Sequence, residues 1–402
     1  MKIIKFILAL PAMIEGRMLM YLTGQHQNTP SHPQLVSDIS HVALAFMRSS
    51  VFNRPTNSEA LAGVDEWPLF TTVSETRKKF EEGTKILVAI GGWGDTDGFE
   101  EAASTDETRE LWASNVARMV ENTGADGVDI DWEYPGGNGE HYLQPNQTNP
   151  TKAWQITAYP LLLAAIRQRL PPPKLITAAV PGLPRDMLAF TKSTIPLILP
   201  SLDFLNIMTY DLMNRRDNAT KHHAGIEASL TSLEAYSSFG IPPEKMNGGF
   251  AFYVKGFRTE TTEIGRAKCK RAWKENSGIG CPTGLMEDPA TGGDLGKTTA
   301  FSWHDTIPSE FQVSFGRAKE GRKWDEVGGG TGFWDEVEDM WWTWEDEKAI
   351  EDKVKKVVGG RKIGGVFAWG LGEDGDEYSH LQALSRSYWD LPNARKESRD
   401  EL

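Results

Sequence analysis

The sequence is short of cysteine, of long apolar runs and of basic charge. Cys269 and Cys281 are the only two cysteines in 402 residues, which excludes a disulfide scaffold and a CxxC metal site but allows one bridge in an oxidising compartment. No stretch approaches the ~20 consecutive apolar residues of a membrane span, so we expect no membrane insertion. The net charge of −13 disfavours nucleic acid as a partner, because its phosphates would be repelled.

The chain also lacks Ser/Thr/Pro-rich linkers, low-complexity tracts and internal repeats. We therefore expect no appended binding module, and we predict a monomer. The length of 402 residues fits either two or three average domains or one α/β barrel with an insertion. The 14 Trp residues are either ordinary core residues or flat apolar faces for ligands such as sugar rings.

Short apolar, β-branched runs alternate with helical patterns along the chain. One such helix carries Trp112, Val116 and Met119 on one face and stops at Gly124. Alternating strands and helices predict a parallel sheet, and eight such units predict a closed (β/α)8 barrel of the α/β class. The eight predicted strands are 17–23, 41–46, 85–90, 127–132, 175–180, 204–209, 249–253 and 365–369.

One interval, from residue 254 to about 333, has no barrel-like strand, although it holds both cysteines and many glycines. A structureless loop of this length is improbable in a compact fold. We therefore predict a small insertion domain over 255–333, between the seventh and eighth barrel strands, with the barrel over 17–254 and 334–390. The cluster Trp341, Trp342 and Trp344 is expected to pack the last helix, or to cap a cleft.

The two ends give conflicting signals for localisation. The four residues from Arg399 to Leu402, in an exposed tail over 391–402, are close to the Lys-Asp-Glu-Leu address that a receptor reads for retention in the endoplasmic reticulum. Retention requires entry, but residues 1–16 form only a weak signal peptide, with a short apolar run interrupted by Pro11. We expect the endoplasmic-reticulum lumen or the secretory pathway, with the retention receptor as a partner. Secretion and the cytoplasm are the alternatives.

Three alternating acids lie in the run from Gly124 to Tyr134. Asp129, Asp131 and Glu133 are two residues apart, so on a strand they share one face, and the apolar residues between them share the other. Like charges this close cannot all ionise, so at least one acid should hold its proton near neutral pH. Such an acid is what cleavage of a glycosidic bond requires. Glu133 lies nearest the C-terminal end of the strand, where barrels have their active sites.

Two other interpretations of the three acids compete with this one. They could form a structural cluster paired to Lys or Arg, or they could bind a divalent metal ion. No basic residue or His neighbours the run in sequence, which favours the catalytic interpretation.

The pattern Asp126-x-x-Asp129-x-Asp131-x-Glu133 resembles the DxxDxDxE signature of family 18 glycoside hydrolases, the chitinases. Segments 89–93, 208–211 and 364–369 resemble the family's SxGG, M-x-Y-D and Trp-bearing segments on the third, sixth and eighth strands. The resemblance runs from Arg17 to Tyr388 and is greatest to intracellular fungal members. It implies that the insertion is an α+β domain that deepens the cleft.

The resemblance implies a retaining, substrate-assisted mechanism. Glu133 would protonate the leaving oxygen, and the substrate's own acetamido carbonyl would attack the anomeric carbon to give an oxazolinium ion. Water would then open this ion with Glu133 as base. Asp131 would orient the acetamido N–H, Asp129 would share a proton with Asp131, and Tyr210 would hold the acetamido oxygen. No metal or organic cofactor is needed.

The resemblance also implies which residues bind substrate. Trp369 would be the floor under the distorted sugar, and the remaining pocket residues would be Trp93, Tyr134, Met208, Asp211, Tyr21 and Phe46. For each aromatic, core packing is the alternative. Asp126, which precedes the strand, is expected to be structural near the site, and so are Gly91 and Gly92.

One position departs from the family pattern. Ala89 stands where the family usually has Ser, near the foot of the row of acids, where a hydroxyl can hydrogen-bond an aspartate. The departure leaves open how the acids are tuned, but it does not affect the proton donor.

Three functions fit the resemblance. A chitinase that hydrolyses β-1,4-linked N-acetylglucosamine in chitin or chitooligosaccharides is favoured, because Trp93 and Trp369 with a large insertion indicate a deep groove for a linear polymer. An endo-β-N-acetylglucosaminidase acting on N-glycans is the first alternative. A non-catalytic chitin-binding lectin is the second, although such lectins typically lack the terminal acid.

Overall fold

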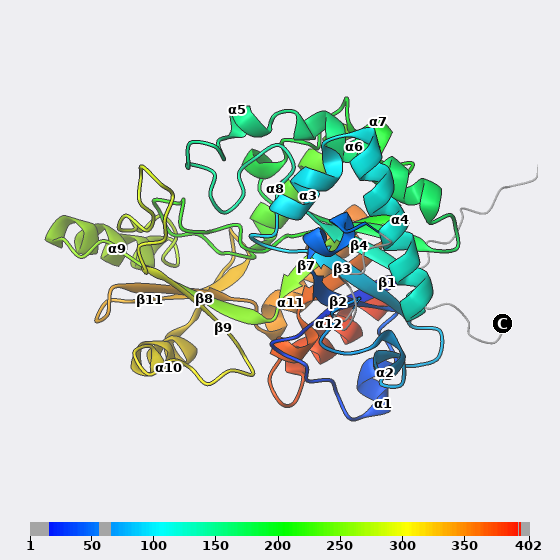
Figure 1. Ribbon diagram of the computed structural model, residues 1–402. Helices are drawn as coiled ribbons and strands as arrows, with labels where there is room; N and C mark the ends of the chain where they lie inside the picture. The colour runs from blue at the N-terminus through cyan, green and yellow to red at the C-terminus, as the bar shows by residue number, and fades with distance from the viewer. Residues whose placement is uncertain (1–15, 56–65, 393, 395–402) are drawn as a thin grey trace, which may run out of the picture.

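The predicted barrel is confirmed by the computed structural model, which describes residues 16–55, 66–392 and 394 (Figure 1). Eight parallel strands close in the order β1-β13-β7-β6-β5-β4-β3-β2. Their bounds are β1 Arg17–Thr23, β2 His41–Met47, β3 Lys85–Gly91, β4 Gly127–Asp131, β5 Leu175–Val180, β6 Phe204–Ile207, β7 Met246–Ala251 and β13 Gly365–Trp369. Residues 1–15 of the predicted signal segment and the final tetrapeptide 399–402 lie outside the described residues.

Strand β7 begins at Met246, before the predicted start at 249. Gly248 and Gly249 lie inside it and pair with Val366 and Phe367 of β13. Glycine is depleted in strands, so the pattern of side chains did not reveal this part of the strand.

Helices cover the outside of the barrel. Helix α4 is capped by Thr105 at its start and stopped by Gly124 in the left-handed conformation, as predicted. Within the described residues, no helix is both long and apolar enough to cross a membrane. The barrel helices are α1 Pro33–Val36, α2 Val73–Arg77, α3 Asp97–Ala103, α4 Asp106–Thr123, α5 Asn149–Lys152, α6 Gln155–Arg169, α7 Ile195–Ile198, α8 Ile226–Phe239, α11 Glu347–Lys353 and α12 Ser379–Trp389.

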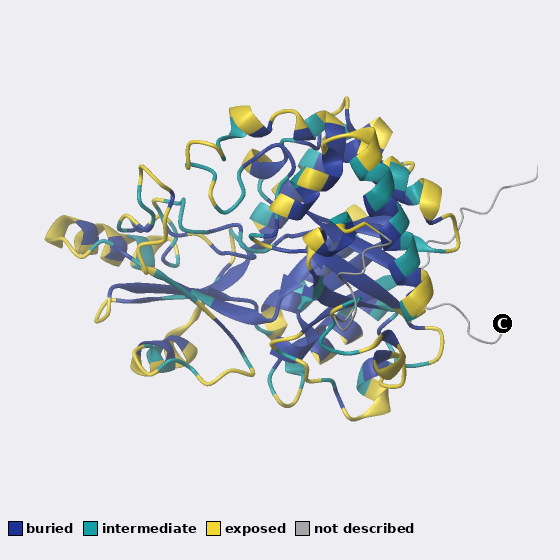
Figure 2. Cartoon of the chain, in the orientation of Figure 1, coloured by how far each residue is buried: buried dark blue, intermediate teal, exposed yellow. Residues whose placement is uncertain are grey.

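The core lies between the barrel and this layer of helices. Val128, Ile130 and Trp132 of the β4 segment point outward into it, and Trp132 stacks on Phe99 of α3 with ring centroids 5.2 Å apart. Figure 2 shows the barrel strands buried and the helices exposed only on their outer faces. The outward face of β4 therefore provides packing, and the inward face is left for the acids.

A second sheet projects from one side of the barrel (Figure 1). It is antiparallel in the order β10-β11-β12-β8-β9, with α9 Glu263–Glu275 and α10 Gln312–Gly321 beside it. Its strands are β8 Tyr253–Arg258, β9 Thr298–Ser302, β10 Lys323–Asp325, β11 Gly330–Asp335 and β12 Met340–Trp344. The sheet extends beyond the predicted 255–333, because β12 pairs with β8 and β11.

The expectation that the three tryptophans pack the last helix is wrong. They lie on β12, where alternate side chains face opposite sides of the sheet. Trp341 packs with Cys269 of α9 on one side, and Trp342 and Trp344 pack with Phe315 of α10 on the other. A strand that is covered on both faces has apolar residues at consecutive positions instead of alternating apolar and polar residues. The sequence pattern of β12 therefore did not identify it as a strand.

The two cysteines form a disulfide inside this insertion. The closed loop is attached to the connection between β6 and α8, because Thr220 N–H donates to Cys281 O at 2.8 Å and Cys281 N–H donates to Thr220 Oγ1 at 2.9 Å. The loop therefore fixes a segment that borders the mouth of the barrel.

A buried ion pair holds the end of the insertion against the barrel. Lys353 Nζ lies 3.0 Å from Glu345 Oε1, with side chains only 1% and 3% exposed. The other carboxylate oxygen accepts the Ala251 N–H at 2.7 Å, and Lys353 Nζ donates to Thr209 O at 2.9 Å. The pair thus ties the residues after β12 to the ends of β6 and β7.

Lys353→Met should destabilise the protein by about 3–5 kcal/mol, because Glu345 is left as a buried charge without its cation. Denaturant unfolding measures this loss. Lys348→Met, on the same helix, is the matched control, since Lys348 pairs with Asp352 at the surface and should contribute about 1 kcal/mol or less. Equal losses in both variants would contradict the importance of the buried pair.

Candidate active site

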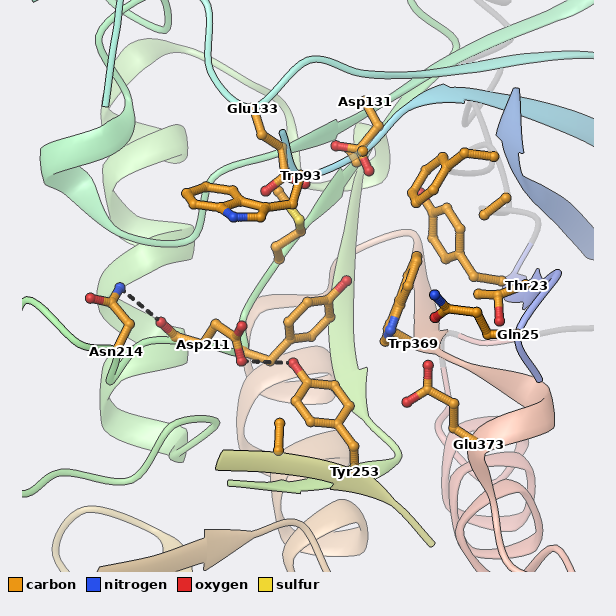
Figure 3. Close-up of a pocket in the computed structure, with 18 of the residues that line it drawn as sticks. Thr23, Gln25, Trp93, Asp131, Glu133, Asp211, Asn214, Tyr253, Trp369 and Glu373 are labelled. Atoms are coloured by element: carbon orange, nitrogen blue, oxygen red, sulfur yellow. Dashed lines mark hydrogen bonds between the residues drawn. The ribbon is translucent and has the colours of Figure 1, made fainter. Parts of the chain in front are cut away.

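A cavity of about 1000 Å³ opens at the C-terminal ends of the barrel strands and is bordered by the insertion (Figure 3). This is the end of the barrel where active sites form. The predicted site residues that line it are Tyr21, Phe46, Gly91, Gly92, Trp93, Asp131, Glu133, Tyr134, Met208, Tyr210, Asp211 and Trp369. Asp129 and Asp126 do not line it.

Asp129 is completely buried at the foot of the row of acids. It accepts hydrogen bonds from Tyr21 Oη at 2.6 Å, from Thr177 Oγ1 and from Asn206 Nδ2 at 3.1 Å. Burial raises its pKa, and these hydrogen bonds lower it. Ala89 is its register partner on β3, so neighbours on three other strands supply the hydrogen bonds that a serine there could have contributed.

Asp131 lies one step higher, and its Oδ1 is buried without a hydrogen-bond partner. Burial, then the carboxylates of Glu133 and Asp129, raise its pKa well above the usual range. A buried, unpaired carboxyl oxygen is rare in folded proteins. Asp131 is one of the residues that line the cavity, so a ligand bound there lies next to this carboxyl group.

Glu133 follows the end of β4 and turns its carboxyl group into the cleft (Figure 3). Burial raises its pKa to about 7, the charges of Asp211 and Asp186 add to this, and a hydrogen bond with Tyr134 opposes it. The group therefore holds a proton under mildly acidic conditions and can release it near neutral pH, as a general acid and base must.

Asp126 lies outside the cleft, before β4. Its Oδ2 accepts from Arg77 Nη2 at 2.9 Å and from the Ile86 N–H at 2.7 Å. These contacts join α2 and β3 to the start of β4, and they give Asp126 no route to a ligand in the cleft.

Two glycines let the end of β3 approach its neighbours. Gly91 has a φ of +111° and a Cβ there would lie 2.2 Å from Asp131 O; Gly92 has a φ of +93° and its Cβ would lie 2.6 Å from the Phe46 ring. Neither the conformation nor the space admits a side chain. The pair therefore fixes Asp131 and Phe46 relative to each other.

Aromatic side chains form the floor and one wall of the cleft. Trp369 stacks on Phe46 at 5.5 Å with an angle of 22°, and Tyr21 packs against it at 5.5 Å. Trp93 remains 47% exposed and meets Tyr134 edge-on at 6.3 Å. Trp369, which packs against Phe46 and Tyr21 and lines the cleft, is suited to binding the flat face of a sugar ring.

Asp211 is held by two residues of the insertion. Tyr253 Oη donates to its Oδ1 at 2.8 Å (Figure 3), and Lys255 Nζ pairs with Oδ2 at 2.9 Å. Burial raises the pKa of Asp211, but Lys255 and His223 outweigh it and hold the pKa below the usual range. Asp211 is thus an anion close to an acid, Glu133, that keeps its proton.

Several polar residues of the cleft were not predicted from the sequence. Lys255 and Tyr253 come from β8, which is not a barrel strand. Glu373 follows the end of β13, a position where barrels place functional side chains, and this rule could have found it. The other unpredicted polar residues are Thr23, Gln25, His26, Arg48, Asp95, Asn138, Asp186, Asn214, Arg215, Arg216, Thr298, Ser302 and Asp305.

Within the described ranges, no group of three or more His, Cys, Asp or Glu side chains is placed to hold a metal ion. The cleft instead combines a row of acids on one strand, a platform of aromatic rings and a (β/α)8 frame. This combination is typical of barrel-type glycoside hydrolases.

The model of the glycosyl hydrolases family 18 matches residues 17–374, and the chain belongs to this family. Chitinase 1 of Aphanocladium album is 28% identical over 264 residues, which cover 57% of this chain and 58% of that protein. Chitotriosidase-1 of Mus musculus is 29% identical over 225 residues, covering 49% and 46%. The match therefore spans roughly half the length of these curated relatives.

Solved structures share the fold. A chitinase from Rhizomucor miehei aligns with a TM-score of 0.67 and 20% identity, covering 92% of this chain and 99% of that one. A class V chitinase from Nicotiana tobaccum in complex with NAG4 aligns with a TM-score of 0.67 and 16% identity, covering 93% and 99%. At these identities the likeness establishes the barrel architecture.

Proposed function

We propose that the protein is a chitinase that hydrolyses β-1,4-linked N-acetylglucosamine polymers with retention of configuration, with Glu133 as general acid and base. The observation that carries the proposal is the pair of acids above Trp369. Glu133 has a pKa of about 7, and beside it Asp131 presents a buried oxygen without a partner. One acid can deliver a proton, and the other can hold a polar group of the substrate.

In the proposed mechanism the sugar to be cleaved lies on Trp369. Asp131 accepts a hydrogen bond from the acetamido N–H, and Tyr210, whose burial raises its pKa and keeps it protonated, donates a hydrogen bond to the acetamido oxygen. The acetamido oxygen attacks the anomeric carbon while Glu133 protonates the departing oxygen. Water then opens the oxazolinium ion as Glu133, now a carboxylate, takes a proton from that water.

Direct attack by Asp131 is the alternative route, and it also retains configuration. A thiazoline analogue of the cyclic intermediate separates the two routes, since it should inhibit strongly only if the acetamido group is the nucleophile. Proton NMR of early products should show the β-anomer. Finding the α-anomer, or no inhibition by the thiazoline, would exclude the proposed mechanism.

The substrate is tested by digesting chitotetraose and a high-mannose glycopeptide side by side. The exposed Trp93 continues the aromatic platform beyond Trp369, which suits successive sugars of a linear chain, and a solved relative of the same fold is in complex with NAG4. Cleavage of the glycopeptide alone would favour the endo-β-N-acetylglucosaminidase alternative. Binding of both without cleavage would favour a lectin.

The activity should fall as pH rises above about 7, because the proton of Glu133 is then lost and the leaving oxygen cannot be protonated. On this alkaline side of the pH profile, kcat/KM should come to fall about tenfold for each pH unit. A pH series with chitotetraose measures it. Full activity two units above neutrality would contradict the assignment of the proton donor.

We propose that the protein works in an oxidising compartment of the secretory pathway, such as the endoplasmic-reticulum lumen, as a monomer. The disulfide between Cys269 and Cys281 supports this, since such bridges are rare in reducing compartments. Imaging a tagged chain with and without residues 399–402 tests the retention receptor, and sedimentation tests the monomer. A cytoplasmic signal from both forms would overturn the assignment.

A further inference from the structure

The two ends of the cleft carry different ionic groups. At one end two arginines, Arg215 and Arg216, pair with Glu287 and Asp186. Arg215 and Arg216 lie against the loop that follows Glu133, where Arg216 Nη2 donates to Asn138 O at 3.1 Å and Arg215 Nη2 to Glu140 O at 3.4 Å. At the other end the lining includes the acids Glu373 and Asp305. Figure 3 shows Glu373 on the opposite side of Trp369 from Glu133 and Trp93.

The position of the proton donor gives this difference a direction. Glu133 must face the oxygen of the leaving group, so the leaving sugar lies on the side of Trp93. The sugar that precedes the cleaved one then lies past Trp369, beside Glu373. The end with Arg215 and Arg216 thus receives the leaving portion of the chain, and the acidic end, with Glu373 and Asp305, receives the portion retained on the enzyme.

The acidic end has little positive charge of its own. Among the described residues, the only basic side chain paired with either acid is His26, whose Nε2 lies 2.9 Å from Asp305 Oδ1 and whose Nδ1 lies 3.9 Å from Glu373 Oε1. That Nδ1 is buried without a hydrogen-bond partner. Glu373 is only 7% exposed, and burial, then the charges of Asp305 and Asp211, raise its pKa to about 8. The carboxyl group of Glu373 therefore holds a proton at a place where a bound cation can balance its negative charge instead.

We propose that Glu373, with Asp305 beside it, binds the ammonium group of a glucosamine unit in the sugar that precedes the cleaved one. The inference rests on the proposed function and narrows its substrate to partly N-deacetylated chains. The cleaved sugar itself must keep its acetamido group, because that group is the nucleophile. When the ammonium binds, the proton of Glu373 is released to solvent, so charge is conserved at the wall.

The preference for glucosamine should therefore depend on pH, because both Glu373 and the amine of the sugar titrate near neutral pH. The titratable groups that face Glu373 come from four segments of the cleft: His26 after β1, Asp305 after β9, Asp211 and Tyr210 after β6, and Tyr253 on β8. Titration of Glu133 and Asp131 affects acetylated and deacetylated substrates alike, so it cancels in a ratio of the two rates.

The test uses two fluorogenic 4-methylumbelliferyl disaccharides. Both have N-acetylglucosamine next to the fluorophore, and the preceding sugar is glucosamine in one and N-acetylglucosamine in the other. The measured quantity is the ratio of kcat/KM for the glucosamine compound to that for the acetylated compound. In Glu373→Gln this ratio should fall about tenfold, the loss expected for one charge-assisted contact. In the natural protein the ratio should pass through a maximum near neutral pH, where Glu373 can ionise while the amine still carries its proton, and this maximum should be absent in the variant.

Asp376→Asn is the matched control, because Asp376 is on the same turn but its side chain is 93% exposed; its ratio should equal that of the natural protein. Calorimetry of the natural protein with the glucosamine disaccharide should also show proton release, as a binding enthalpy that changes with the buffer. An equal ratio in Glu373→Gln and the natural protein, or equal losses on both compounds, would overturn the inference. Absence of any hydrolysis of the acetylated compound by the natural protein would instead overturn the proposed function.

Discussion

Glu133→Gln should lower the turnover of chitotetraose at least about a thousandfold, because glutamine cannot donate a proton to the leaving oxygen. Glutamine has nearly the same shape as a protonated glutamic acid, and Glu133 is neutral when it acts, so the fold and the affinity for oligosaccharide should change little. Initial rates measure the loss, and calorimetry with chitotetraose measures the affinity.

Glu227→Gln, an exposed position on α8, is the control for the chemical change itself and should retain normal turnover. Turnover near normal in Glu133→Gln would contradict the assignment of Glu133 as the general acid and base. Loss of both turnover and affinity would mean that Glu133 supports the cleft rather than the reaction.

Asp131→Asn should lower turnover about a hundredfold or more, the scale for losing one positioned electrostatic partner of a developing charge. The pH profile should also change. Burial, and then the Glu133 carboxylate beside it, raise the pKa of Asp131, so the two acids titrate as a pair, and a neutral amide at position 131 removes one of the two titrating groups.

Asp126→Asn provides the matched comparison, since it makes the same chemical change at the first position of the signature but outside the cleft. It should weaken the contact with Arg77 and leave the pH profile in place. An unchanged profile in Asp131→Asn would contradict coupling between Asp131 and Glu133.

The barrel and the row of acids could be predicted because both depend on the local sequence. Strand periodicity alone placed Asp129 and Asp131 on the inner face and Val128 and Ile130 on the outer one. The alternating strands and helices gave the closed sheet. The role of each acid in catalysis stays a prediction, supported by the burial and pKa shifts of the group.

The partners of the acids could not be predicted, because they come from distant strands. Asp129 is bound by Tyr21, Thr177 and Asn206, which are brought together only when the barrel closes. The alternative of a cluster neutralised by Lys or Arg depended on such distant partners. In the structure Asp126 is the acid of the signature that pairs with an arginine, Arg77. The groups that bind Asp129 are hydroxyl and amide groups.

The insertion was harder to delimit than the barrel, for a physical reason. Its strand β12 is covered by α9 on one face and α10 on the other, so it lacks the alternation that marks a half-exposed strand. The tryptophans of that strand looked like part of an aromatic helix face.

The two contacts that β8 makes with Asp211 have a consequence for engineering. Lys255 and Tyr253 belong to the insertion, but the carboxylate they hold belongs to the barrel. A chimera that exchanges the insertion between relatives would therefore also exchange the charge balance around the general acid. Transplanted modules that lack a cation at position 255 would be expected to shift the working pH of the recipient barrel, even if every residue of the barrel were left untouched.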